Sequence, residues 1–194
     1  MKGLMKGSIS IGAHYGEEYE EWLSLGAKNF IFFEPVKANF IKLERIMKGK
    51  PGVTLFNKAL GNKVGKIRMF TETEHQGKSC SILEPKIHLT QYPDIEFNTT
   101  EIVSINKLDN IAYNRELYDH LHIDTQGYEL EVLKGALQSL DYITTITCEV
   151  YKEELYAGCS MLHEVQDLLY ENLFDLIGVA WCGLTWGNAK FEKR

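Results

Sequence analysis

FDLIGVAWCGLTWGNAKFEKR, residues 174–194, closes the sequence with two strand-like runs and very little chain between them. The runs are FDLIGVAW and TWGNAKFEKR, and only about Cys182 to Leu184 separate them. A connection this short can make a hairpin, whereas a parallel pair needs a crossover of a dozen or more residues. The sequence therefore predicts a sheet that ends in an antiparallel strand.

The rest of the chain alternates strand-like and helix-like stretches. Strands are expected near residues 8–11, 29–35, 51–61, 66–70, 101–111, 121–123 and 144–151, and helices near 17–25, 36–47, 128–140 and 161–173. Such alternation is typical of an α/β fold with a mostly parallel sheet and helices on both faces. Residues 71–100 are polar with little periodicity, and we expect a long, partly irregular excursion of the kind that often carries function.

Composition predicts one globular domain over residues 1–194. Hydrophobic residues make up 44% and charged residues 25% of the chain, and its four cysteines are scattered, so reduced thiols are expected. The formal net charge of −6 argues against a nucleic-acid partner, because phosphate binding relies on clustered Lys and Arg. No apolar run reaches about 18 residues, and the first residues carry too short an apolar stretch for a secretory signal. We therefore expect a cytoplasmic protein without a membrane partner.

The loop after the first expected strand departs from the dinucleotide fingerprint. A nicotinamide-binding domain favours G-x-G-x-x-G there, but this chain has Gly12 and Gly16 with Ala13 and His14 between them. An acid, Glu34, still ends the second strand, where a carboxylate can accept hydrogen bonds from both ribose hydroxyls of an adenosine. The nicotinamide fingerprint therefore fails, while any adenosine cofactor could use Glu34.

A second informative stretch is HIDTQGYELEVLKGAL, residues 122–137, which runs from a strand through a tight turn into a helix. Asp124 and Gln126 come at the carboxyl end of that strand, the edge of an open α/β sheet where ligands usually bind. Two interpretations of Asp124 stay open: a functional carboxylate, or a simple cap of the following helix.

In the order of its motifs, the sequence resembles the FkbM family of S-adenosylmethionine-dependent methyltransferases. The matching blocks are IGAHYGE, FFEP, LFNKALGN, GKSCSIL, IDTQGYELEVLKGA, CEVY and WGNAKFEKR. The resemblance implies a Rossmann-like, seven-stranded methyltransferase sheet and O-methylation of a small, carbohydrate-like or other polyhydroxylated acceptor. For the cofactor it implies binding by Gly12, Ala13, His14, Gly16, Glu34, Asn57 and Ala59.

The chain also departs from this family at three points. Ser10 stands where the family usually has an acid, His14 stands in place of Asn, and His122 in place of Lys. In addition, only a few residues precede the first strand in this sequence, so we expect a domain without the family's usual amino-terminal helices. We expect residues 71–100 or a partner subunit, as in a homo-oligomer, to cover the substrate.

Hydroxyl methylation requires a group that removes the proton, because neutral hydroxyls are poor nucleophiles. Asp124 and Glu149 end two strands, and if these strands are neighbours their carboxyl groups converge at one edge of the sheet. The pair can bind a divalent cation, or one carboxylate can accept the proton directly. For Glu149 a purely structural hydrogen bond remains the alternative, and for His122 a core position.

Two other functions remain open from sequence alone. One is a non-catalytic nucleotide-binding or assembly module with the same fold, which Ser10 and the short amino terminus favour. The other is methylation of protein or nucleic acid, which the acidic composition disfavours.

Overall fold

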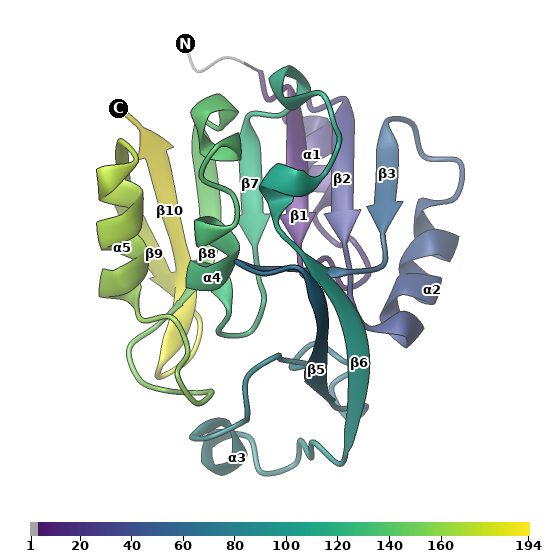
Figure 1. The fold of residues 1–194 in the computed structure, drawn as a ribbon, viewed down its shortest axis with the longest axis vertical. Coiled ribbons are helices and arrows are strands. Elements are labelled where there is room, and N and C mark those ends of the chain that lie inside the picture. Colours follow the sequence, from purple (N-terminus) through teal and green to yellow (C-terminus); the bar gives the residue numbers. More distant parts are fainter. Residues whose placement is uncertain (1–3) are drawn as a thin grey trace.

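A computed structural model of the protein describes residues 4–194, and a seven-stranded sheet forms its centre (Figure 1). The strand order is β3, β2, β1, β7, β8, β10, β9. These strands span Gly7–Ile11 (β1), Asn29–Phe33 (β2), Val53–Phe56 (β3), His120–Ile123 (β7), Thr145–Tyr151 (β8), Phe174–Trp181 (β9) and Trp186–Lys193 (β10). All pairings from β3 to β8 are parallel, which confirms the predicted, mostly parallel sheet.

The last two strands form the predicted hairpin. β10 is antiparallel to both β8 and β9, and residues 182–185 make the connection. Because β10 inserts between β8 and β9, its first residue, Trp186, pairs with Tyr151 at the carboxyl end of β8. The hairpin therefore closes the sheet and also delivers Trp186 to the edge where the parallel strands end.

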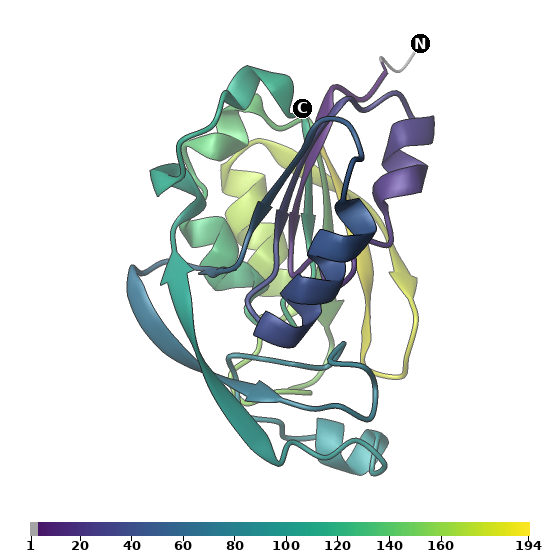
Figure 2. The ribbon, with the colours of Figure 1, turned by 90° about the vertical axis from the view of Figure 1, so that its right-hand side faces the viewer.

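Helices lie on both faces of this sheet, as expected (Figure 2). α1 (Tyr19–Ser24) and α2 (Lys37–Met47) cover one face, and α4 (Glu129–Lys134) and α5 (Leu162–Glu171) cover the other. β2 shows the reason, because NFIFF is apolar at every position after Asn29. Phe30 and Phe32 pack under α1 and α2, while Ile31 and Phe33 face the opposite way into the larger core.

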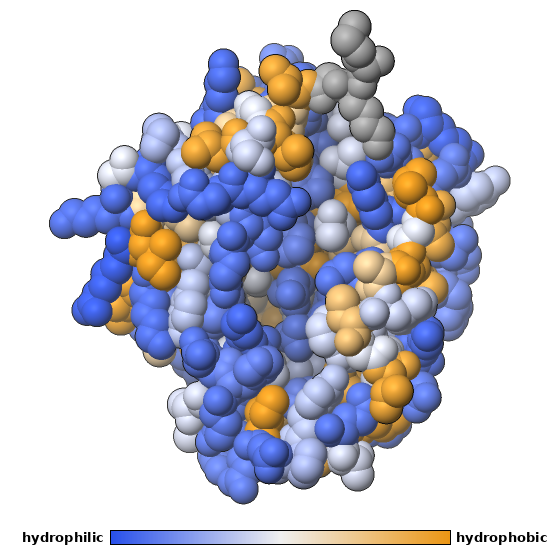
Figure 3. Space-filling model, turned by 180° about the vertical axis from the view of Figure 1, so that it is seen from behind, coloured by the Kyte–Doolittle hydropathy of each residue, from blue (hydrophilic) through white to orange (hydrophobic). Residues whose placement is uncertain are grey.

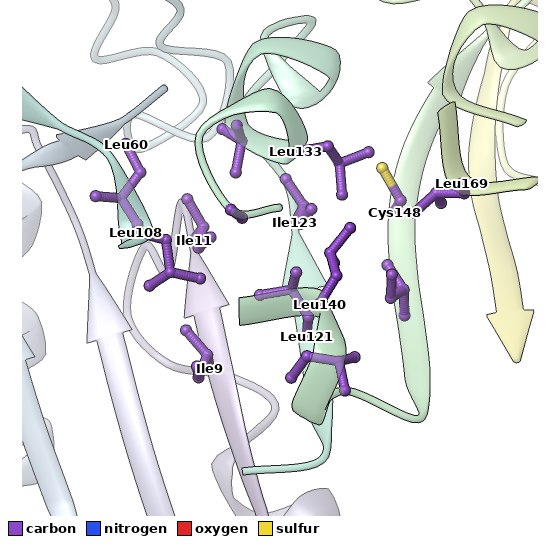
Figure 4. Close-up of a cluster of buried hydrophobic side chains, with 14 of the residues drawn as sticks. Ile9, Ile11, Leu60, Leu108, Leu121, Ile123, Leu133, Leu140, Cys148 and Leu169 are labelled. Atoms are coloured by element: carbon purple, nitrogen blue, oxygen red, sulfur yellow. The ribbon is translucent and has the colours of Figure 1, made fainter. Parts of the chain in front are cut away.

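The larger core lies beneath α4 and α5 (Figure 4). Alternate residues of β1, β7 and β8 point into it, which follows from the two-residue period of a strand. Its fully buried members include Ile9, Ile11, Leu121, Ile123, Leu133, Leu140, Cys148 and Leu169. Each such side chain contributes roughly 1.5–3 kcal/mol through burial, so this core fixes how the carboxyl ends of β1, β7 and β8 lie side by side.

The opposite face is polar over β7, β8 and β10. His120, Thr145, Thr147 and Lys190 line a hollow of about 590 Å³ beside Trp22, and hydrophilic side chains dominate the middle of Figure 3. On this face α1 packs against the β1 and β2 side of the sheet. The sequence matches this arrangement, because the strands are apolar on both sides only where helices cover both.

A second sheet lies beyond the carboxyl ends of the main strands (Figure 1). It consists of β4 (Ala59–Leu60), β6 (Thr99–Asn106) and β5 (Gly65–Thr71), in that order, with β5 and β6 antiparallel. The strands expected near 66–70 and 101–111 therefore exist but belong to this smaller sheet. Between them, residues 72–98 form an excursion whose one helix, α3, spans His88–Gln91.

Some helices are shorter than their sequence patterns indicate. The pattern from Tyr128 to Leu140 predicts a single helix, but α4 ends at Lys134 and a 3-10 helix follows at Ser139–Tyr142. A Cβ atom at Gly135 would lie 2.1 Å from the carbonyl oxygen of Gly61, so the chain turns here where two backbones cross. Two further 3-10 helices span Leu108–Asn110 and Arg115–Leu117. Within residues 4–194, no helix is both long and apolar enough to cross a membrane.

Candidate active site

A cavity of about 330 Å³ lies between the carboxyl edge of the main sheet and the excursion. This volume falls within the range of small-molecule sites. Seven of the nine predicted site residues line it: Gly12, Ala13, His14, Glu34, Ala59, Asp124 and Glu149. The fold thus brings together loops that follow β1, β2, β7 and β8, as the sequence argument required.

Gly12 is required by a close crossing of two loops. Its φ is +81°, and a Cβ atom would lie 1.7 Å from the carbonyl oxygen of Asp124. The amide groups of Gly12 and Ala13 both donate to the carbonyl of Phe33, at 3.0 Å each. These contacts hold the ends of β1, β2 and β7 together, so the glycine loop and the Asp124 turn share one fixed geometry.

Glu34 is a buried carboxyl group in the wall of the cavity. One oxygen accepts from the amide of His14 at 2.9 Å, and the other accepts from the amide of Val36 at 2.8 Å. Burial raises the pKa of Glu34 to about 7, although the two amide donors and His14 oppose the shift. Glu34 is therefore held in one orientation, and its carboxyl oxygens can accept further hydrogen bonds from a ligand in the cavity.

His14 links the glycine loop to the excursion. Its Nδ1 lies 2.7 Å from Glu17 Oε1, and its Nε2 lies 3.0 Å from the carbonyl oxygen of Gln76. Burial by itself lowers the pKa of His14, but the hydrogen bonds to Glu17 and Gln76 outweigh it, so the pKa is raised above 6.5. Both ring nitrogens face acceptors, which suits the protonated ring.

Two of the predicted cofactor residues lie behind the cavity wall. A Cβ atom at Gly16, where φ is +75°, would lie 2.2 Å from the Met47 side chain, so this glycine allows α2 to pack closely. The Asn57 side chain donates to the carbonyls of Glu34 and Pro35, at 2.9 Å each. Both residues shape the loops that hold Glu34 and do not themselves line the cavity.

Gln126 connects the two predicted catalytic carboxyl groups. Its side-chain nitrogen lies 2.7 Å from Asp124 Oδ1 and 2.9 Å from Glu149 Oε2. The Tyr156 hydroxyl donates to Gln126 Oε1 at 2.9 Å, which fixes the orientation of the amide. Gln126 also has a φ of +55°, a left-handed conformation that a side chain of this size rarely adopts.

Sequence reasoning placed Gln126 at the right edge but did not count it among the site residues. The only signal was its position two residues after Asp124 in IDTQGYE. Its bridging role depends on β8 lying beside β7, with Ile123 paired to Cys148 one residue before Glu149.

The environments of Asp124 and Glu149 differ. Glu149 is 4% exposed and also accepts a hydrogen bond from the Tyr151 hydroxyl. Burial, followed by the nearby charges of Asp124 and Glu129, raises the pKa of Glu149 well above its usual range. This shift favours the protonated form of Glu149 and makes Asp124 the candidate proton acceptor of the pair.

Glu129, not Asp124, organises the turn before α4. Its Oε1 accepts from the amides of Thr125 and Gly127 at 2.9 and 3.0 Å, and from the Thr125 hydroxyl at 2.9 Å. Burial raises the pKa of Glu129 to about 7. Glu129, five residues after Asp124, thus accepts the hydrogen bonds that a capping Asp124 would have accepted. The Asp124 carboxylate instead contacts the side chain of Gln126.

The family departures at Ser10 and His122 lie on the polar face of the sheet. Ser10 is fully buried and pairs with His122 across β1 and β7. The His122 ring meets Trp22 edge-on at 5.6 Å, and its Nε2 lies 3.7 Å from Glu18. Both side chains are outside the cavity lining, which favours the core interpretation of His122.

The excursion forms the opposite wall of the cavity. Glu72 shapes its first turn by accepting from the amides of His75 and Ser79, at 2.7 and 3.0 Å. The Tyr156 hydroxyl lies 3.0 Å from the Ser79 carbonyl, and the Ser81 hydroxyl donates to the Gln126 carbonyl at 2.7 Å. The excursion is thus fastened directly to the Gln126 turn.

Two solved structures that resemble this chain in fold are methyltransferases. A methyltransferase FkbM from Methylobacillus flagellatus KT has a TM-score of 0.62 at 13% identity, over 96% of this chain and 43% of that one. The magnesium protoporphyrin IX methyltransferase ChlM from Synechocystis PCC 6803, solved with bound S-adenosylmethionine, has a TM-score of 0.56 at 8% identity, over 99% of this chain and 71% of that one. At these identities the likeness shows the fold, which is the methyltransferase fold.

The family follows from the sequence comparison. The family model for the methyltransferase FkbM domain matches residues 10–176. The chain therefore belongs to the FkbM methyltransferase family, and the resemblance inferred from its motifs is confirmed. It is also similar to the 2-O-methyltransferase NoeI of Sinorhizobium fredii (strain NBRC 101917 / NGR234), with 28% identity over 169 residues that cover 83% of this chain and 70% of NoeI.

Proposed function

We propose that this methyltransferase transfers the methyl group of S-adenosylmethionine to a hydroxyl oxygen of a small, sugar-like acceptor. One observation carries the proposal: the Asp124 carboxyl group lines the same cavity as Glu34, an acid suited to a ribose. The name of the relative NoeI, a 2-O-methyltransferase, supports oxygen as the acceptor atom.

The residues that line the cavity fit S-adenosylmethionine. Glu34 can accept from ribose hydroxyls, and Ala59 and Leu60 provide apolar wall beside it. Gly12 and Ala13 leave room at the turn after β1. When bound there, S-adenosylmethionine supplies an electrophilic methyl group on a positively charged sulfur.

The part of the chain in this reaction is to hold the acceptor and remove its proton. Asp124 would accept the hydroxyl proton as the oxygen attacks. The hydrogen bond from the Gln126 amide would hold the carboxylate in the same position throughout the reaction. Glu149, whose burial favours the protonated form, would limit the negative charge next to Asp124. In this proposal the Asp124 carboxylate is therefore the proton acceptor.

A divalent cation in this scheme would be held by the carboxyl groups of Asp124 and Glu149. The Gln126 amide already occupies one oxygen of each carboxyl group, so a cation bound by both groups would compete with it. Among residues 4–194, no group of three or more His, Cys, Asp and Glu side chains is arranged to hold a metal. Metal use is decided by assay with magnesium and with a chelator.

Transfer of an isotopically labelled methyl group from S-adenosylmethionine tests the proposal. The acceptors would be a panel of methyl glycosides, peptides and oligonucleotides, each with magnesium or chelator. We expect label on glycosides, at an oxygen, and loss of transfer in Asp124→Asn with cofactor binding retained. Label only on peptides or nucleic acid, or full turnover of Asp124→Asn, would overturn it.

A further inference from the structure

The cavity extends past Asp124 and Glu149 into an arm whose walls come from distant parts of the chain. This arm, which we call the aromatic arm, is lined by His88, Tyr92, Ile95, Leu155 and Trp186. None of these five side chains carries a permanent charge, and three of them have aromatic rings. The arm therefore differs in chemistry from the part of the cavity around Glu34.

Hydrogen bonds across the fold hold the aromatic arm in shape. Trp186 Nε1 donates to the Tyr92 hydroxyl at 2.8 Å, and the Thr185 hydroxyl donates to Gln91 Oε1 at 3.0 Å. The amide of His88 donates to the carbonyl of Leu155 at 3.0 Å. The excursion is thus pinned to the closing hairpin and to the loop after β8, and the arm exists before any ligand binds.

His88 is the polar group of this arm. The residue is 2% exposed, and its ring centroid lies 5.0 Å from Tyr92, 5.1 Å from Phe97 and 5.3 Å from Tyr156. Its Nδ1 is buried without a hydrogen-bond partner among the described residues. A buried polar atom without a hydrogen bond costs about 1–3 kcal/mol, so its presence in the wall of a cavity calls for an explanation, and a hydrogen bond to a ligand is one.

The His88 ring is held in its neutral form. Burial lowers its pKa to about 4. The nearby carboxylate of Glu72, which by itself would raise the pKa, does not compensate. A neutral imidazole offers one donor and one acceptor, and it can exchange them by turning over. It is therefore suited to hydroxyl groups, which also donate and accept, and is unsuited to pairing with a carboxylate or phosphate.

We propose that the aromatic arm binds the ring of an uncharged sugar, with Trp186 and Tyr92 against its apolar face and His88 hydrogen-bonded to one of its hydroxyls. This inference rests on the proposed function and narrows its acceptor to neutral sugars. A sugar ring has a face of C–H groups and an edge of hydroxyls, which matches aromatic walls that hold one neutral polar group. His88 is then a positioning residue: it orients the acceptor toward Asp124 and takes no proton.

Fluorine NMR of protein labelled with 5-fluorotryptophan tests where the sugar binds. The chain has three tryptophans, and the substitutions Trp181→Phe and Trp186→Phe assign their signals. We expect neutral methyl hexosides to shift the Trp186 signal and to leave that of Trp181, which lies on β9, unchanged. Methyl glucuronide, which carries a carboxylate, should have a smaller effect. The inference fails if no neutral hexoside shifts Trp186, or if the charged glycoside shifts it equally.

Calorimetry with S-adenosylhomocysteine separates this inference from the proposed function. If the product analogue binds and glycosides are methylated while Trp186 stays silent, only the aromatic arm assignment is wrong. If the analogue does not bind at all, the proposed function fails first.

Substitution of His88 gives a kinetic test. His88→Phe keeps an aromatic ring without the polar atoms. We expect the KM for the hexoside that serves as methyl acceptor to rise about tenfold, the equivalent of one lost hydrogen bond. The kcat should change less, the Kd of S-adenosylhomocysteine should stay constant, and His88→Asn should recover part of the loss. His163→Phe, on the exposed side of α5, is the matched control. Should His88→Phe fail to fold, Tyr92→Phe serves instead, and an unchanged KM in the folded variant would contradict the assignment.

Discussion

The two parts of the cavity are built in different ways. The part around Glu34 comes from loops that directly follow β1 and β2, and the hydrogen bonds that Glu34 makes with His14, Val36 and Asn57 span at most 23 residues of sequence. The aromatic arm comes from segments 94 residues apart, as between Tyr92 and Trp186. The comparison teaches that cofactor chemistry can be encoded in local motifs, whereas the acceptor wall depends on how excursion and hairpin dock.

Asp124→Asn should give the largest effect, because it removes the proton acceptor shared by both parts of the cavity. We expect kcat to fall by about 10²–10⁴-fold, the usual contribution of general base catalysis. Single-turnover methyl transfer measures the loss, and calorimetry should show cofactor binding largely intact. Asp141→Asn, at an exposed aspartate, is the control. A variant that turns over normally would remove Asp124 from the chemistry.

Glu34→Gln should affect only the cofactor part. We expect the Kd of S-adenosylhomocysteine to rise by about 10–100-fold, since a hydrogen bond to a charged group is worth roughly 1.5–3 kcal/mol. Acceptor KM should hardly change, and Glu44→Gln, an exposed change on α2, should be silent. Equal losses in cofactor and acceptor binding would contradict the division into two parts.

The same carboxyl group predicts a pH dependence. The pKa of Glu34 in the free protein is about 7, above its unfolded value, so its contribution to stability is full below about pH 4.5 and is lost as pH rises through about 7. Ribose hydroxyls favour the ionised form, so cofactor affinity should weaken as pH falls through about 7. Calorimetry in buffers of different ionisation enthalpy should show proton release on binding. Glu34→Gln should abolish that release.

Tyr156→Phe probes the junction between the two parts and should have an intermediate effect. Its hydroxyl is within hydrogen-bond distance of Gln126 Oε1 and the Ser79 carbonyl, so its loss frees the amide that holds Asp124. We expect kcat to fall by about tenfold, the value of one buried hydrogen bond. The Kd of S-adenosylhomocysteine should be unchanged, and Tyr170→Phe, at an exposed tyrosine of α5, is the control. If kcat stays at the wild-type value, the Gln126 bridge does not matter for transfer.

The smallest expected effect is on the contact of His14 with Gln76. Because the folded pKa of His14 lies above 6.5, its contribution to stability is full below about pH 6.5 and is lost as pH rises through the folded pKa. His14→Asn should therefore reduce the free energy of unfolding by at most about 1 kcal/mol at about pH 5 and by less at about pH 9. Urea unfolding of both proteins at the two pH values measures the difference. A larger loss at high pH would contradict the protonated bridge.

Much of the fold could be predicted because its signals are local. The two-sided apolar run of β2 and the short connection of the closing hairpin each limit the chain to one arrangement. The smaller sheet was not predictable in the same way. Residues 66–70 and 101–106 do form strands, but strand patterns do not identify the partner, and only packing sets β5 and β6 apart from the main sheet.

The candidate site shows the same division. Motifs supplied Gly12, Glu34, Asp124 and Glu149, all of which line the cavity. Asn57 and Gly16 belong to the same motifs but lie behind its wall, because one residue along a turn decides whether a side chain faces ligand or backbone. Gln126 was passed over as an amide in a turn, since its importance arises only when β8 brings Glu149 within 2.9 Å of it.

By itself, the sequence determined the alternating α/β order, the antiparallel end of the sheet and the acids at the ends of its strands. Those features follow from hydrophobic period, loop length and chain direction, which act over a few residues. Tertiary structure alone decided that burial raises the pKa of Glu149, that Gln126 spans the two carboxyl groups, and that His88 and Trp186 line the same cavity. These depend on burial and on contacts between segments far apart in sequence, and the energies of such contacts exist only once the chain has folded.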